Sequence, residues 1–397
     1  MTMEYPAPPP RIPGPIWALG FVSLLTDVGS EMVHSLLPVL LASGLGASAL
    51  TIGLIEGAAE ALVLVTKVFS GYLSDAIGRR KPLVLFGYGL AAAVKPLFPL
   101  AHSVAAVTTA RLLDRFGKGV RGAPRDALVA DLAPASIRGA CFGLRQSMDT
   151  VGAVLGPLGA VGLLSLYAND IQTVLWFAVL PGFLAVALLL KVPEPADVAR
   201  KPARLPLSRQ GLASLGRGYW LLVAVGAVIA LARFSEAFLV LRAAERGLPI
   251  TYVPLVLVVM SVVYALSAYP AGRLSDRMPR SALLALGMAI LAIADVALAL
   301  AESYPLLFTG IALWGLHMGL TQGILASLIT DTTPAAYRGT AFGVFNLVAG
   351  VGLLLASAAA GWLWDSHGPA AAFWLGAIIA ALAALLCAKM PAPAPNR

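Results

Sequence analysis

Three ionisable residues share one face of the first long apolar stretch of the sequence. Asp27, Glu31 and His34 are separated by four and three residues, so on an α-helix their side chains point the same way. Two buried carboxylates one turn apart repel each other, which favours a bound proton on one of them. We therefore predict that Asp27 and Glu31 form a proton-coupling site and that His34 contacts a cargo molecule. A purely structural ion pair of these carboxylates with Arg111 or Arg233 is the alternative.

Other charged residues also lie inside apolar stretches. The fourth stretch carries Arg111, Asp114 and Arg115, and the seventh carries Arg233 and Glu236. A charge at the centre of a membrane costs about 2.5–3.5 kcal/mol on insertion scales, so these side chains should face the protein interior or water.

The second apolar stretch carries charges at helical spacing as well. Glu56, Glu60 and Lys67 are separated by four and seven residues, which places them on one helix face. We expect a network of ion pairs within that helix.

The composition is that of a membrane protein with many spans. Of the 397 residues, 59% are hydrophobic and 12% are charged, and the mean hydropathy is +0.85. Aqueous domains need more polar surface than this. A membrane helix needs about 20 apolar residues, so twelve such helices use nearly the whole chain. We expect an all-α polytopic membrane protein and no room for a separate catalytic domain.

Breaks between the apolar stretches define the expected organisation. We predict a disordered N-terminal tail (1–14), a six-helix bundle (15–191), a basic linker (192–217), a second six-helix bundle (218–390) and a C-terminal tail (391–397). Lys and Arg gather in the loops on the side of the termini, whereas the opposite side holds essentially Arg242 and Arg246. This asymmetry predicts that both termini are cytoplasmic and absorbs much of the net charge of +8, so a nucleic-acid partner is not expected.

An internal repeat supports the division into two halves. "DLAPASIRGACFG" begins at Asp131 and "DTTPAAYRGTAFG" begins at Asp331, an offset of 200 residues. A shorter pair, "GYLSD" and "GRLSD", begins at Gly71 and Gly272. Two homologous six-helix halves are the simplest explanation.

The loop after the second stretch carries a recognisable motif. "GYLSDAIGRRK", which contains Gly71, Asp75, Gly78, Arg79 and Arg80, resembles the signature loop of the major facilitator superfamily. The resemblance implies twelve membrane helices in two pseudo-symmetric bundles that work by alternating access. It also implies that this loop stabilises the closed cytoplasmic face, with Asp75 at the N-terminus of the eleventh helix and both arginines in ion pairs. The second copy departs from the motif, with Pro279 and Ser281 in place of Gly78 and Arg80.

In that family the first, fourth, seventh and tenth helices line a central cavity. Carried over to this sequence, the resemblance places eight residues in the cavity: His34, Arg111, Asp114, Arg115, Arg233, Glu236, His317 and Gln322. Such a mixture of charges suits an anionic or zwitterionic amphipathic molecule.

The fifth stretch contains "GAVLGPLG", which is similar to the antiporter motif of the same family. Gly152 and Gly156 would let helices approach closely, and Pro157 would bend the backbone. The motif favours export over import.

The sequence thus predicts a proton-coupled exporter of a small molecule in the inner membrane. Two alternatives are an exporter of a divalent metal or metal chelate and a proton-coupled importer; a receptor that does not transport is a third. The chain lacks G-x-S-x-G, H-E-x-x-H and a phosphate-cradling loop with its lysine, so we expect neither an enzyme nor a bound cofactor. We expect no resident metal site, and a monomer that works with protons within the lipid bilayer.

Overall fold

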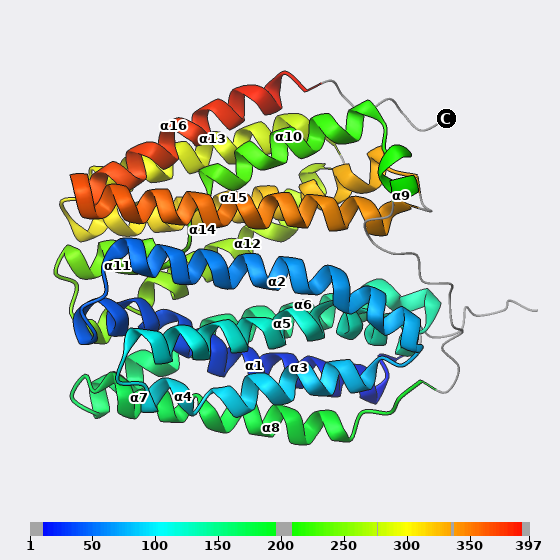
Figure 1. Cartoon of the computed structure of the whole chain (residues 1–397), viewed down its shortest axis with the longest axis horizontal. Coiled ribbons are helices and arrows are strands. Elements are labelled where there is room, and N and C mark those ends of the chain that lie inside the picture. Colours follow the sequence, from blue (N-terminus) through cyan, green and yellow to red (C-terminus); the bar gives the residue numbers. More distant parts are fainter. Residues whose placement is uncertain (1–10, 196–208, 276, 335–336, 391–397) are drawn as a thin grey trace, which may run out of the picture.

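The computed structural model describes residues 11–195, 209–275, 277–334 and 337–390, which form helices and turns without a β-strand among them (Figure 1). The helices of the first half are α1 (Gly14–Val39), α2 (Ala49–Ile77), α3 (Lys81–Val94), α4 (Leu97–Leu100), α5 (Val104–Leu132), α6 (Arg138–Leu166), α7 (Ile171–Phe177) and α8 (Val179–Leu190). Those that follow are α9 (Arg209–Ala213), α10 (Arg217–Ala232), α11 (Ala237–Glu245), α12 (Leu255–Ser275), α13 (Arg280–Ala299), α14 (Tyr304–Thr332), α15 (Arg338–His367) and α16 (Pro369–Ala388). A π-helical turn (Leu40–Gly44) extends α1, and short 3-10 turns cover Ala135–Ile137 and Ile250–Tyr252.

These helices make twelve membrane spans. Eleven segments of the described chain are long and apolar enough to cross a bilayer, and the charge-rich α5 is the twelfth span. Three spans are interrupted: α3 continues as α4, α7 as α8, and α10 as α11. The predicted all-α, twelve-helix fold is confirmed.

The spans form two bundles that meet along a few helices. In the first bundle α1 packs on α6 and α2 on α5, and in the second α13 packs on α14 and α16. Between the bundles α2 packs along α15 and α6 along α12, and Figure 1 shows α2 and α15 side by side at the boundary. The chain enters α1 and leaves α16 at the same end of the molecule, which we call the termini end.

Parts of the expected tails and linker lie outside the described residues, namely 1–10, 196–208 and 391–397. The remainder of the expected linker contains the short helix α9.

The two bundles are in close contact at the end opposite the termini. A side-chain carbon at Gly53 of α2 would lie 2.2 Å from the carbonyl oxygen of Ser357 in α15, so glycine is required for this approach. The carboxylate of Asp365 in α15 accepts hydrogen bonds from the first two backbone N–H groups of α2, at Ala49 (3.0 Å) and Leu50 (2.9 Å). Because the first N–H groups of a helix lack partners within the helix, Asp365 acts as a cap across the bundle boundary.

A second contact closes the same end. The Thr251 hydroxyl, in the loop before α12, donates to the Asn169 side-chain oxygen, in the loop after α6, at 2.5 Å. At the termini end, by contrast, α2 and α15 line a cavity of about 420 Å³ between Gly71, Asp75, Gly339 and Asn346. The molecule is therefore closed at the opposite end and hollow between the bundles at the termini end.

Candidate functional site: a charged cavity between the bundles

A central cavity with two adjoining chambers lies between the bundles. The first chamber, of about 370 Å³, includes His34, Glu60, Arg115, Arg233, Trp314 and Gln322 in its wall. The second, of about 340 Å³, includes Asp27, Lys67, Arg121, Arg125, Asp149 and Tyr264. Glu31, Lys118 and Glu236 line both chambers, so the two volumes share one wall.

Helix α1 contributes a row of ionisable side chains to this wall. Asp27 faces the second chamber, Glu31 faces both, and His34 faces the first. His34 Nδ1 lies 3.4 Å from Glu31 and its Nε2 lies 3.8 Å from the buried Glu56 of α2, so the imidazole bridges a cavity carboxylate and a buried one. Within the described residues Asp27 makes no hydrogen bond or ion pair, and His34 is the only hydrogen-bond or ion-pair partner of Glu31.

The acidic face of α2 pairs with the basic face of α5. Glu56 lies 2.5 Å from Arg111, with both side chains 1% exposed, and Glu60 lies 3.5 Å from Arg115. Lys67 of α2 reaches Asp126 of α5 at 3.9 Å. The expected network within α2 is therefore wrong: the shared helical spacing aligns these residues with α5 instead.

Arg111, Asp114 and His317 were expected in the cavity, but the structure places them behind its wall. The Arg111 guanidinium is turned toward Glu56, and Asp114 lies 3.6 Å from the buried Lys95, directly after α3. The His317 ring is fully buried, with Nδ1 3.0 Å from the carbonyl oxygen of Gly287. Each of these polar groups finds its partner on a neighbouring helix of its own bundle, which stabilises it away from the cavity.

The seventh span is broken where it meets the cavity. Helix α10 ends at Ala232 and α11 begins at Ala237, and the intervening Arg233–Glu236 segment lines the first chamber. The backbone N–H of Ser235 is satisfied by the Ser357 hydroxyl at 3.0 Å. Irregular backbone at membrane depth is tolerated where it lines a cavity or is buried in protein, which is the case here.

Two cations of the first chamber lack a carboxylate partner. Within the described residues neither Lys118 of α5 nor Arg233 has an ion pair; the Arg233 guanidinium lies 5.9 Å from the centre of the Trp314 ring instead. Lys118 belongs to the first bundle and Arg233 to the second. Within the described residues the first chamber therefore presents one cation without an ion pair from each bundle.

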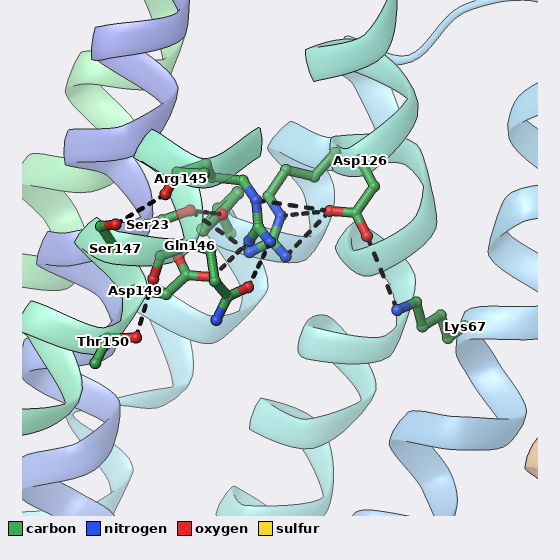
Figure 2. A network of polar contacts seen from close by, with 11 residues as sticks. Ser23, Lys67, Asp126, Arg145, Gln146, Ser147, Asp149 and Thr150 are labelled. Carbon is green, nitrogen blue, oxygen red and sulfur yellow. Dashed lines mark hydrogen bonds and ion pairs between the residues drawn. The ribbon is translucent and has the colours of Figure 1, made fainter. Parts of the chain in front are cut away.

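A polar network lies beside the second chamber and contributes Lys67, Arg125 and Asp149 to its wall (Figure 2). Asp126 occupies its centre, 3.3 Å from Arg125, 4.0 Å from Arg145 and 3.9 Å from Lys67. Arg145 also binds Asp149 one turn further along α6, at 2.5 Å. The network joins α2, α5 and α6 and fixes the charges that face the chamber.

The glycines of the "GAVLGPLG" segment in α6 pack directly against the acidic row of α1. A side-chain carbon at Gly152 would lie 3.0 Å from the Asp27 Cβ and 2.7 Å from the Leu24 carbonyl oxygen. One at Gly156 would lie 3.2 Å from the Glu31 Cβ and 2.5 Å from the Val28 carbonyl oxygen. Pro157 is buried in the same helix. The two glycines thus set the distance between α6 and the backbone that carries Asp27 and Glu31.

We expect Gly156→Ala to push α1 away from α6 and to impair transport. Overpacking of this kind costs about 1–3 kcal/mol, because the Val28 carbonyl oxygen is backbone and cannot turn aside. Thermal unfolding in detergent and cargo flux in vesicles measure the two effects. Gly162→Ala, in the same helix but with no atom within 4 Å, is the matched control and should behave as the parent. Equal behaviour of the two variants would contradict the proposed packing role.

The signature loop forms ion pairs at the termini end, but not all of those expected. Arg80 binds Asp75 at 2.5 Å and Asp131 at 3.3 Å, whereas Arg79 makes no ion pair within the described residues. Asp75, predicted at the N-terminus of α15, pairs with Arg80 and lines the termini-end cavity together with Gly339 and Thr340 at the start of α15. Gly78 ends α2 in the left-handed region (φ 70°), which favours glycine.

The second half repeats part of this arrangement. Arg280 binds Asp331, and these residues stand 200 positions after Arg80 and Asp131. The sequence alignment that placed Ser281 opposite Arg80 is therefore displaced by one residue. Asp276, the counterpart of Asp75, lies outside the described residues.

Several residues of the site were not predicted from the sequence as partners or cavity residues, Lys118 and Glu56 among them. Lys118 continues the helical row Arg111–Arg115 by three residues and could have been assigned to the cavity on that spacing. The pairing of Glu56 with Arg111 was harder to predict, because the sequence does not show which helices are neighbours.

The chain is similar along its length to known membrane transporters. The family model of the Major Facilitator Superfamily matches residues 19–241 and again 222–397. An uncharacterized MFS-type transporter of Methanocaldococcus jannaschii is 32% identical over 378 residues, covering 94% of this chain and 93% of that protein. The multidrug resistance protein MdtH of Cronobacter sakazakii is 26% identical, covering 87% and 85% respectively. The nucleoside transporter NupG shares the fold, with a TM-score of 0.80 at 14% identity over 95% of this chain and 100% of that one.

Proposed function

Because the chain belongs to the major facilitator superfamily, we propose that it is a proton-coupled exporter of a small zwitterionic or anionic organic molecule. The central cavity is the observation that carries the proposal. It lies between the two bundles, is lined by charges of both signs, and is closed at one end only.

Alternating access follows from the way the bundles meet. The Asp365 cap and the Thr251–Asn169 hydrogen bond hold the end opposite the termini shut, while the termini end is hollow. Rocking of one bundle against the other would exchange these states. The Lys and Arg distribution favours cytoplasmic termini, so this form would receive cargo from the cytoplasm.

Proton coupling is assigned to Asp27 and Glu31. Both line the cavity, and neither is paired with Arg111 or Arg233, the partners that a purely structural role would require. A proton and the cationic end of a zwitterionic cargo would compete for these carboxylates, as antiport requires. His34 extends the site by joining Glu31 to Glu56, through which a change of charge at Glu31 would reach Arg111.

The cargo class follows from the unpaired charges of the cavity. Lys118 and Arg233 would bind an anionic group from the two bundles, and Glu236 and Glu31 would bind a cationic one. A divalent metal would face the two unpaired cations, which disfavours the metal alternative. Export is supported by the packing of Gly152 and Gly156 against the coupling residues and by the name of the relative MdtH.

Everted membrane vesicles test this function. A growth screen of deletion and overexpression strains against toxic compounds selects the probes, and the zwitterion norfloxacin, the anion carboxyfluorescein and the cation ethidium start the panel. In vesicles with an acidic interior, a transported probe should release protons and restore the fluorescence of acridine orange. If Asp27→Asn and Glu31→Gln abolish that proton release, the release depends on the proposed coupling site.

Two results would overturn the proposal. Movement of probe and proton in the same direction would identify an importer of the symport type. Transport of ethidium or of divalent metal ions, with no flux of zwitterions or anions, would refute the assignment of Lys118 and Arg233 to cargo.

Asp365→Ala should shift the protein away from the form seen here. The variant loses both hydrogen bonds that join α15 to the start of α2, and one such bond to a charged group contributes about 1.5–3 kcal/mol. The ratio of the two forms should therefore change by roughly tenfold or more. Spin labels on Ile77→Cys of α2 and Arg338→Cys of α15 report the shift as a shorter distance at the termini end.

The control is Ser103→Ala, which removes a side-chain cap within one bundle. The Ser103 hydroxyl accepts a hydrogen bond from the Ala106 backbone N–H (3.2 Å) at the start of α5. Its loss should leave the label distances unchanged. Cys141 and Cys387 are fully buried, so the labels go to the introduced cysteines. An unchanged distance in Asp365→Ala would refute the latch role of this residue.

A further inference from the structure

A buried carboxylate behind the cavity is bound to one of the residues in the cavity wall. Asp295 of α13 is 0% exposed, and its Oδ1 accepts a hydrogen bond from the indole Nε1–H of Trp314 at 3.1 Å. Its Oδ2 has no hydrogen-bond partner within the described residues. Asp295 therefore differs from the other buried carboxylates described above, which are all near a cation.

The surroundings of Asp295 are shaped to hold it. Gly376 of α16 faces the carboxylate, and a side-chain carbon there would lie 2.5 Å from Asp295 Oδ2 and 2.8 Å from the ring of Phe234. A buried polar group with a single partner is expensive in the membrane interior. Its presence is explained if the bond to Trp314 serves the neighbouring site.

Trp314 connects this carboxylate to Arg233, one of the unpaired cations of the cavity. One edge of the indole donates to Asp295, while the Arg233 guanidinium lies 5.9 Å from the ring centre. Tryptophan is the strongest of the aromatic partners for a cation at this range. Arg233 stands at the helix break: its N–H makes the last bond of α10, to the Ala230 carbonyl oxygen at 3.3 Å, and its backbone is extended (φ −109°, ψ 101°). Its guanidinium has no ion pair within the described residues, so the Trp314 ring is the partner that the structure gives it.

We propose that Asp295 is a positioning residue of the cargo site, which holds Trp314 in the orientation that keeps Arg233 in the cavity. The inference rests on the proposed function in that Arg233 is taken as the group that binds the anionic part of the cargo. Asp295 itself touches no cargo, because Trp314 separates it from the cavity.

The test compares variants that keep or remove the hydrogen bond. Asp295→Asn keeps an acceptor oxygen for the indole, whereas Asp295→Leu removes it and Trp314→Phe removes the donor. The transport assay uses norfloxacin or carboxyfluorescein, whichever the parent transports. The Asp295→Leu and Trp314→Phe variants should each raise KM by about fivefold to tenfold and change the maximal rate less than twofold. The Asn variant should stay within twofold of the parent. The double variant Asp295→Leu/Trp314→Phe should be no worse than the more severe single one.

A second readout needs no cargo. Phenylglyoxal modifies arginine side chains, and peptide mass spectrometry follows its reaction at Arg233 in the purified protein. The rate should rise in Asp295→Leu and in Trp314→Phe and stay at the parent value in Asp295→Asn. This readout remains valid if the transport proposal fails, so the two failures are distinguishable.

Three results would overturn the inference. An Asn variant as impaired as the Leu variant would show that the charge or proton of Asp295 matters rather than its acceptor oxygen. Unchanged KM and unchanged Arg233 reactivity in the Leu variant would reduce Asp295 to a packing role. If Asp295→Leu does not fold, Trp314→Phe is the test. A KM and an Arg233 modification rate equal to those of the parent would then refute the inference.

Discussion

Glu31→Gln is expected to abolish the concentrative export of cargo while leaving its downhill movement intact. Glutamine has nearly the same shape but neither binds nor releases a proton, so the cavity wall is kept and the coupling is lost. One proton crossing 100 mV supplies about 2.3 kcal/mol. Loss of one coupled proton should therefore lower the cargo ratio across the membrane by roughly 50-fold at that potential. Asp27→Asn should act in the same direction.

Equilibrium accumulation of a transported probe in energised vesicles measures this ratio, and efflux from preloaded vesicles without a gradient measures the downhill rate. Glu302→Gln is the control, since this acid is exposed at the end opposite the termini. The coupling assignment fails if Glu31→Gln and Asp27→Asn both concentrate the probe as well as the parent does.

Glu56→Leu should be the most destabilising of the substitutions considered for this protein. It leaves the Arg111 guanidinium buried without its 2.5 Å partner, and breaking a buried ion pair in this way costs about 3–5 kcal/mol. The double variant Glu56→Leu/Arg111→Met removes both charges and should recover most of that stability. Thermal unfolding in one detergent compares the purified parent, Glu56→Leu and the double variant.

Lys67→Met provides the control on the same pair of helices. Lys67 and Asp126 are 44% and 34% exposed and 3.9 Å apart, so their loss should change stability by less than about 1 kcal/mol. If Glu56→Leu/Arg111→Met is as unstable as Glu56→Leu, the unpaired Arg111 charge is not the cause of the instability. That result would contradict the prediction for the Glu56–Arg111 pair.

The sequence predicts the fold well because its signals are long and repeated. Twelve stretches of apolar residues, the 200-residue repeat and the signature loop each depend on many residues, so a single exception changes little. The break at Arg233–Glu236 was missed because it contains neither Gly nor Pro. It is stabilised by the Ser357 hydroxyl, a contact between distant segments that no local pattern contains.

The candidate site was predicted less completely, for a geometrical reason. Helical spacing shows which side chains share a face, and the row on α1 follows from it. It does not show which helix that face meets, so Arg111 and His317 were assigned to the cavity although they pair behind its wall. The predicted contact of Asp75 with α15 depends on how far apart the bundles stand at the termini end, and a sequence does not specify that distance.

The pairing of α5 with α2 and α3 also bears on how the protein is made. Helix α5 is not among the segments apolar enough to cross a bilayer alone, and each central arginine adds about 2.5–3.5 kcal/mol to its insertion. Its neutralising partners Glu56 and Glu60 stand on α2, which the ribosome completes before α5 is synthesised. Insertion of the fourth span thus depends on a span already in the membrane. We expect a nascent chain with both glutamates removed to leave α5 outside the bilayer, which glycosylation mapping of truncated chains would detect.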